Sequence, residues 1–239
     1  MKLMLTCLLG LTISTSLTAA ELSGELTSKD IKRAAAITSW ASIHRAWTAP
    51  GAHQQLALGL NLGLESTFVP RHNLNELGDK NGIAPSLIPV PRLWTAWELP
   101  ADFYISASFS PGMLYDGISS GGFAGQWTFL NDDNVCMSAL LHYTYARVFG
   151  DMKTHTTGMA AQVGKGLDLW FPYFGLGFIS TNATVSKERV LGGTNRGPYT
   201  VPAIHGFVGA RIDLGAELSF QVDLTGKKVS GALMMSQGF

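Results

Sequence analysis

One pair of side chains in this sequence has the residue types of a nucleophile and its base. Ser138 and His142 are four positions apart in an alternating segment, so both face the same side of a strand. At about 3.3 Å per residue they lie roughly 13 Å apart, too far for the hydrogen bond that activates a serine. Unless His205 approaches from another strand, we expect no hydrolysis or acyl transfer from this pair.

The spacing of the other reactive residues does not support metal or nucleotide chemistry. The histidines form no HExxH motif, and there is no CxxC pair. The runs GGFAG (121–125) and LGGTNRG (191–197) lack the strand-to-helix context of a phosphate-binding loop. We therefore predict neither a metal site nor a cofactor. The histidines are His44, His53, His72, His142, His155 and His205.

The composition narrows the class of protein. Charged residues make up 14% of the chain, against about 25% in soluble domains, while hydrophobic residues make up 46%. This balance argues against disorder, which needs low hydrophobicity and high charge. Lys and Arg number 17 and Asp and Glu also 17, so the formal charge is zero and nucleic-acid binding is not expected.

Residues 1–20 have the pattern of a secretory signal peptide. Lys2 provides a positive start, residues 3–13 are mainly apolar, and small residues up to Ala20 offer a cleavage site. We therefore expect export. Removal of this segment would take Cys7 with it and leave Cys136 as a single thiol, so no internal disulfide is expected.

Residues 21–54 form an N-terminal segment with one predicted helix at 27–47. Thr27 and Asp30 have the spacing of a capping box with a shorter acid. The apolar residues Trp40, Ile43 and Trp47 share one face at helical spacing. We expect this helix either to close a lumen or to lie at a membrane interface with its tryptophans in lipid.

From residue 55 to residue 239 the apolar period changes to two. In QLALGLNLGLE (55–65) every second residue is leucine, and the opposite face carries Gly, Asn and Glu. About ten such segments follow one another. Their length suits a bilayer crossing, which takes about 9–11 residues, better than a globular strand of about 5–6. The weakest candidate is residues 87–99, because Pro89 and Pro91 cannot donate to a ladder.

The connections and the aromatic residues support a membrane barrel. Alternating connections are short on one side, whereas three of the five on the other side are long and polar, and an even strand count brings both ends to the short-turn side. Aromatic residues near the strand ends are expected to form interfacial girdles. The girdle candidates are Phe68, Trp97, Phe103, Phe129, Tyr145, Trp170, Phe171 and Phe239.

The alternation also assigns polar residues to the inner face. Mixed charges inside a narrow barrel can pair and fill the lumen instead of leaving an open pore. We therefore predict a lumen network and a narrow or plugged interior. Its candidates are Glu65, Arg92, Gln126, His142, Gln162, His205, Arg211, Glu217 and Asp223.

The signal peptide, the alternating strands, the stretch PYFGLGF (172–178) and the terminal Phe239 together resemble bacterial outer-membrane β-barrel proteins. The segment IPVPRLWTAWELP (88–100) after a helix is similar to a group of short proteobacterial barrels of unknown activity. The resemblance implies an all-β, closed antiparallel transmembrane barrel of about ten strands (8–12) with a short N-terminal helix. It also implies outer-membrane lipids and the barrel-assembly machinery as partners.

Three functions remain open at this point. The first is an outer-membrane barrel with a transport, receptor or envelope-structural role, which could bind a small solute or lipid. The second is a lipid-modifying outer-membrane enzyme. The third is a secreted soluble barrel around an apolar ligand, which would need apolar faces inside and a charged exterior. The low charge favours the first.

Overall fold

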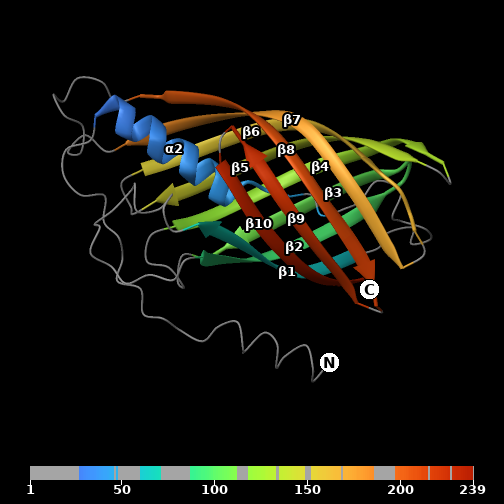
Figure 1. The fold of residues 1–239 in the computed structure, drawn as a ribbon. Helices are drawn as coiled ribbons and strands as arrows, with labels where there is room; N and C mark the ends of the chain where they lie inside the picture. Colours follow the sequence, from blue (N-terminus) through green and yellow to red (C-terminus); the bar gives the residue numbers. More distant parts are fainter. Residues whose placement is uncertain are drawn as a thin grey trace.

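The computed structural model shows one closed β-barrel and a helix that precedes its first strand in the chain (Figure 1). It describes residues 27–45, 47, 60–70, 87–111, 118–132, 135–148, 152–167, 169–185, 197–214, 216–226 and 228–238. The predicted signal peptide and Phe239 lie outside these residues, as do the side chains of Trp40 and Phe68. Among the described helices, none has the length and apolar character needed to cross a membrane.

Ten strands pair with their sequence neighbours, all antiparallel, and β1 also pairs with β10, which closes the barrel. The prediction of a closed antiparallel barrel of about ten strands is confirmed. Closure leaves no strand edge without a partner. The elements are α2 (Ser28–Ser42), β1 (Leu60–Pro70), β2 (Leu87–Leu99), β3 (Phe103–Ser110), β4 (Ile118–Asn131), β5 (Cys136–Val148), β6 (Met152–Gly164), β7 (Trp170–Val185), β8 (Tyr199–Asp213), β9 (Glu217–Thr225) and β10 (Lys228–Gly238).

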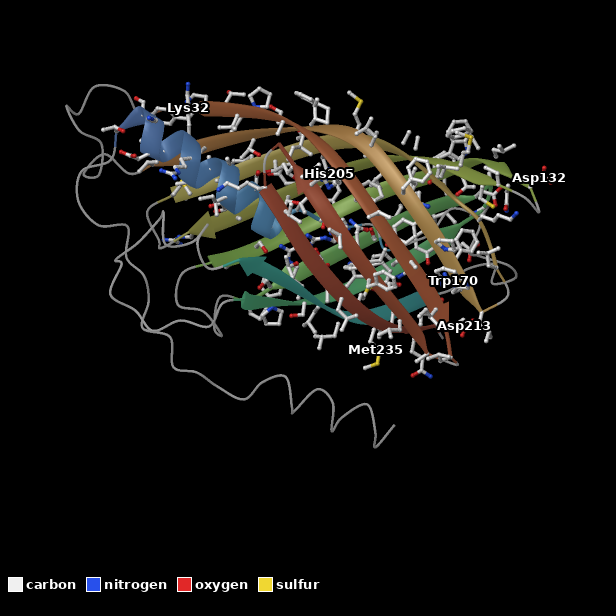
Figure 2. All side chains as sticks on the ribbon, in the orientation of Figure 1. Lys32, Asp132, Trp170, His205, Asp213 and Met235 are labelled. Carbon is white, nitrogen blue, oxygen red and sulfur yellow. The ribbon has the colours of Figure 1, made fainter. Side chains whose placement is uncertain are left out.

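The two ends of the barrel differ in their connections. At the short-turn end, where β1 starts and β10 ends, the strands are joined through residues 100–102, 132–135, 165–169 and 214–216. At the opposite end, the loop end, the longest connections span residues 71–86 and 186–198. In Figure 2, Lys32 of α2 lies at the loop end, whereas Asp132 and Asp213 lie at the short-turn end.

Strand β2 includes the two prolines that made it the weakest candidate. Pro89 and Pro91 are both in register with β1, opposite Phe68 and Ser66. The β2–β3 ladder begins only at Leu93, so the prolines interrupt no ladder on that side. A strand with one neighbour tolerates a residue without an N–H, as an edge strand does.

Helix α2 is shorter than predicted. Thr27 and Asp30 form the predicted capping box, in which the Asp30 N–H donates to the Thr27 hydroxyl at 3.3 Å. The hydrogen bonds from Thr27 lower the pKa of Asp30 below its usual value. The helix ends at Ser42, however, because Ile43 adopts φ −54° and ψ 130°. Ile43 and Trp47 therefore do not lie on a helix face, and the predicted end near residue 47 is wrong.

On the inner wall, aromatic rings of one strand lie over glycines of the neighbouring strand. Gly158 stands directly across from His142, and Gly175 across from Phe207. A Cβ on either glycine would overlap the opposing ring. Each ring therefore lies over the glycine opposite it, which is a use of glycine where another group approaches closely.

We expect Gly175→Ala to destabilise the barrel by about 1–3 kcal/mol, because the added methyl must push Phe207 into the lumen. The measurement is urea unfolding of the protein in detergent micelles. The control is Gly206→Ala, where the nearest atom to a Cβ is Leu176 Cδ1 at 3.7 Å and the change should stay within about 0.5 kcal/mol. Equal effects of the two substitutions would contradict this account of the wall.

Candidate functional site in the barrel lumen

The nine inward positions predicted from alternation all lie on the lumen face. Eight are buried, and Glu217, at the short-turn end, has a side chain that is 23% exposed. Glu65, Arg92, His205 and Asp223 come together in one cluster. Arg211 and Glu217 form a separate pair, with 3.0 Å between Arg211 Nη2 and Glu217 Oε1.

The other three predicted positions lie elsewhere on the lumen wall. His142 and Gln162 line a small cavity together with His205, which is labelled inside the barrel in Figure 2. Gln126 lines a second hollow at the short-turn end, beside Glu98 and Asp102. The structure thus divides the predicted network into a central cluster, a terminal ion pair and two small hollows.

The central cluster is organised around Arg45, which sequence analysis did not single out. Its Nε donates to Asp223 Oδ2 at 2.7 Å, and its Nη1 donates to Glu65 Oε1 at 2.8 Å. The side chains of all three residues are fully buried. Burial of such charges is tolerated only when each is paired and hydrogen-bonded. Arg45 therefore fixes the N-terminal segment to β1 and β9.

The same cluster is completed by a second arginine and a histidine. Arg92 Nη1 donates to the Ile43 carbonyl at 2.7 Å and lies 3.4 Å from Glu65 Oε1. His205 Nε2 lies 3.0 Å from Asp223 Oδ1. Two guanidinium groups thus face two carboxylates in this cluster.

His44, which precedes Arg45, is hydrogen-bonded to β3 and β5 of the wall. The N–H of His44 donates to the Thr144 hydroxyl at 3.1 Å, and its ring nitrogens lie 2.7 and 2.8 Å from the hydroxyls of Ser108 and Ser106. Gly122 makes room for this residue, because a Cβ there would lie 2.9 Å from His44 Cβ.

Trp47 anchors the other end of this stretch. Its indole N–H donates to Glu65 Oε2 at 2.9 Å. Its ring packs in an apolar cluster with Trp94, Ala96, Tyr104, Ala232 and Met234.

The N-terminal segment therefore runs along the lumen from the loop end toward the short-turn end. His44 is bound to Ser108, late in β3, whereas Trp47 packs beside Tyr104, early in β3. Helix α2 precedes both residues and contacts β5 to β8 as well as β1 and β10. Figure 1 shows it at the loop end. We call residues 28–47 the plug. The alternative of a helix at the membrane interface does not fit these contacts.

The structure does not bring Ser138 and His142 together as a nucleophile and its base. The Ser138 hydroxyl and both ring nitrogens of His142 have no hydrogen-bond partner among the described residues, so they do not bond to each other. His205 bonds to Asp223, and its ring centre lies 6.5 Å from that of His142. Within the described part of the chain, no group of His, Cys, Asp and Glu could hold a metal ion.

The aromatic girdle candidates divide between the two faces of the wall. Trp97, Phe103, Phe129 and Trp170 are 43–48% exposed near the short-turn end. Phe171 was predicted beside them, and this is wrong. Adjacent residues of a strand face opposite sides, so Phe171 turns inward and packs on a cluster that includes Tyr173 and Phe207. Tyr145 is half-buried on the outer face near the loop end.

No protein-family model matches the chain, and no curated protein matches it in sequence. Solved barrels are similar in architecture. The beta domain of the Bordetella autotransporter BrkA aligns with 77% of this chain and 100% of its own, at 10% identity and a TM-score of 0.46. For Omp33, an outer membrane protein of Acinetobacter baumannii, the shares are 78% and 100%, the identity 7% and the TM-score 0.34. For Ail of Yersinia pestis, they are 77% and 98%, 11% and 0.29.

We expect Arg45→Met to destabilise the folded barrel by about 3–5 kcal/mol, because Asp223 would lose its arginine and Glu65 would keep only Arg92, at 3.4 Å. In Arg45→Met/Asp223→Asn one positive and one negative charge remain, so part of that loss should be recovered. Urea unfolding in micelles measures both variants and the single substitution Asp223→Asn. Strict additivity of the two single substitutions would contradict the proposed charge balance.

Proposed function

We propose that this chain is an outer-membrane barrel protein whose lumen is closed at rest by its own N-terminal plug, and that a small solute passes when the plug moves. The observation that carries this proposal is the buried ion pairing of Arg45 across the lumen with Glu65 and Asp223. The outer surface supports the membrane location, and the packing of the plug supports the closed state.

The outer wall has the character of a surface covered by lipid. Leu141 is 66% exposed, Ile204 67% and Phe174 61%, and many other large apolar side chains are exposed around the barrel. A soluble monomer rarely exposes a continuous apolar patch beyond a few hundred Å². The polar residues meanwhile line the interior. This arrangement is the reverse of what a soluble barrel around an apolar ligand requires, so that alternative does not fit the structure.

A location in the outer membrane would assign each end of the barrel to one side of that membrane. Outer-membrane barrels have short turns on the periplasmic side and longer loops outside. By this rule the start of α2 faces the exterior, and residues 43–47 point toward the periplasm. Insertion would be the task of the barrel-assembly machinery, as for barrels of this class.

The plug occupies the free space of the lumen. A barrel of about this strand number encloses little space beyond its own side chains. The plug fills that space from two opposite walls, because His44 bonds to β3 and β5 whereas Arg45 bonds to β1 and β9. Opening therefore requires the contacts of Arg45 and His44 to break together.

Some of the contacts between the plug and the wall can be replaced by water. His44 is held by serine and threonine hydroxyls, which can bond to water when the plug leaves. At the loop end, Lys29 and Lys32 remain exposed. A receptor or purely structural role would leave the plug in place, and conductance recordings distinguish these roles from transport.

We expect wild-type protein in planar bilayers to be mostly closed, and a variant lacking the plug (residues 28–47) to conduct steadily. Gly122→Val should favour the open state, because its side chain occupies the space of His44; its contact with the Tyr143 carbonyl, 3.0 Å from the Cβ position, affects both states. Overpacking of about 1–3 kcal/mol in the closed state would raise the open population roughly 5- to 150-fold. The matched control on β4 is Gly125→Val, whose Cβ position has no atom within 4 Å. Wild-type conductance equal to that of the deletion variant would refute the plug.

The orientation of the barrel can be tested by thiol labelling of intact cells. In a Cys136→Ser background, we expect Lys29→Cys and Lys153→Cys to react with a membrane-impermeant maleimide, since both positions are exposed at the loop end. Lys165→Cys, exposed at the short-turn end, should react only after the outer membrane is permeabilised. Labelling of all three in intact cells would argue against the proposed membrane location.

A further inference from the structure

A small cavity lies between the plug and the wall of the barrel. His44, Arg45 and Trp47 of the plug line it on one side, and residues of β5 to β9 line it on the other. The cavity is about large enough for one water molecule. Its wall residues include His142 of β5. A change in the charge or hydration of His142 therefore acts at a surface that the plug covers.

The ring of His142 makes no hydrogen bond within the described part of the chain. The residue is 5% exposed, and neither ring nitrogen has a hydrogen-bond partner there. Its Nε2 lies over Gly158 of β6, where a Cβ would overlap it. Buried polar groups in native proteins nearly always have a partner, and each exception calls for an explanation. The contacts that hold the plug do not use this ring.

The two other histidines of the described lumen have hydrogen-bond partners. The ring nitrogens of His44 lie 2.7 and 2.8 Å from two serine hydroxyls of β3. His205, labelled in Figure 2, has its Nε2 at 3.0 Å from Asp223 Oδ1. Hydroxyl and carboxylate oxygens accept hydrogen bonds from a protonated ring. Both histidines can therefore take up a proton while the plug stays in place, whereas His142 has no such acceptor.

The groups that face His142 come from the plug and from the strands on both sides. Its described cross-strand and cavity neighbours on β4 and β6 are neutral, namely Ala124, Gly158 and Gln162. The titratable or charged groups that face it are His44 and Arg45 of the plug, Tyr173 of β7, His205 of β8 and Asp223 of β9.

Asp223 is the one carboxylate in this set, and its oxygens are already occupied. Oδ2 accepts from Arg45 Nε at 2.7 Å, and Oδ1 lies 2.6 Å from Gln221 Nε2 and 3.0 Å from His205 Nε2. The His205 ring centre lies 6.5 Å from that of His142. A proton on His142 would therefore bury a positive charge whose two N–H groups have no acceptor, and such burial is costly.

We infer that protonation of His142 opens the plug. When the plug leaves the lumen, water reaches the ring and accepts hydrogen bonds from both of its N–H groups. The open state therefore binds the proton more tightly than the closed state does, and a fall in pH shifts the population toward the open state. This inference rests on the proposed function and adds its regulation.

The test measures the open-to-closed ratio of full-length protein in planar bilayers between pH 7.5 and pH 5.5, above the usual titration range of carboxylates. A histidine in water gains its proton near pH 6.5. We expect the ratio to rise up to about tenfold for each unit that the pH falls below about 6.5, because opening takes up one proton. His142→Phe keeps a ring over Gly158 but takes up no proton, so its ratio should stay constant over this range.

The matched control is His155→Phe, which removes a titratable ring from the outer face of the neighbouring strand β6. It should keep the wild-type response, and loss of the response there would overturn the assignment to His142. His142→Gln is a second variant without a titratable group and should behave as His142→Phe does. Urea unfolding at pH 7.5 checks that both variants fold. A wild-type response in either folded variant overturns the inference.

Two further outcomes separate this inference from the proposed function. Wild-type protein that stays closed down to pH 5.5 while Gly122→Val conducts overturns the role of His142 alone. Wild-type protein that conducts at pH 7.5 as well as the variant without residues 28–47 overturns the closed plug, and the inference fails with it.

Discussion

The pairing of Arg45 with two buried carboxylates is the interaction on which the lumen depends. Glu65 belongs to β1 and Asp223 to β9, and β10 lies between these strands. Arg45 also donates to the Ser230 hydroxyl of β10 at 3.3 Å. One side chain therefore connects the three strands around the seam where the first and last strands meet. Removal of any partner leaves charge inside a closed barrel, so the plug and the seam are energetically coupled.

The wall is adapted to contain this plug. A small barrel is usually filled by its own side chains, which would leave no room for a helix and the extended stretch after it. Here the rings of His142 and Phe207 lie over the glycines opposite them, and Gly122 leaves space for His44. The interior combines apolar clusters with polar side chains that bond to His44 and Arg45 of the plug.

The outward side chains of the strands follow a simpler pattern than the inward ones. The apolar belt requires only that every second residue be hydrophobic, which places few demands on individual positions. At the loop end of β5 and β6 this rule gives way to tyrosine, histidine and then cations. The plug and this outer patch share β5, whose Thr144 faces His44 and whose Arg147 faces outward. One strand therefore serves the closed lumen on one face and the membrane boundary on the other.

Alternation with period two is a local property of each strand, so it predicted a closed barrel of about ten strands and placed the nine lumen candidates on the inner face. Glu65 and Asp223 were assigned to the lumen in this way. It did not determine the partners of Arg45. The apolar spacing of Ile43 and Trp47 is typical of a helix. Both residues instead belong to the extended stretch after α2, where Arg92 bonds to the Ile43 carbonyl and Trp47 packs in an apolar cluster. Which residues meet across the lumen depends on the register of all ten strands and on the path of the plug, and only the tertiary structure decides these.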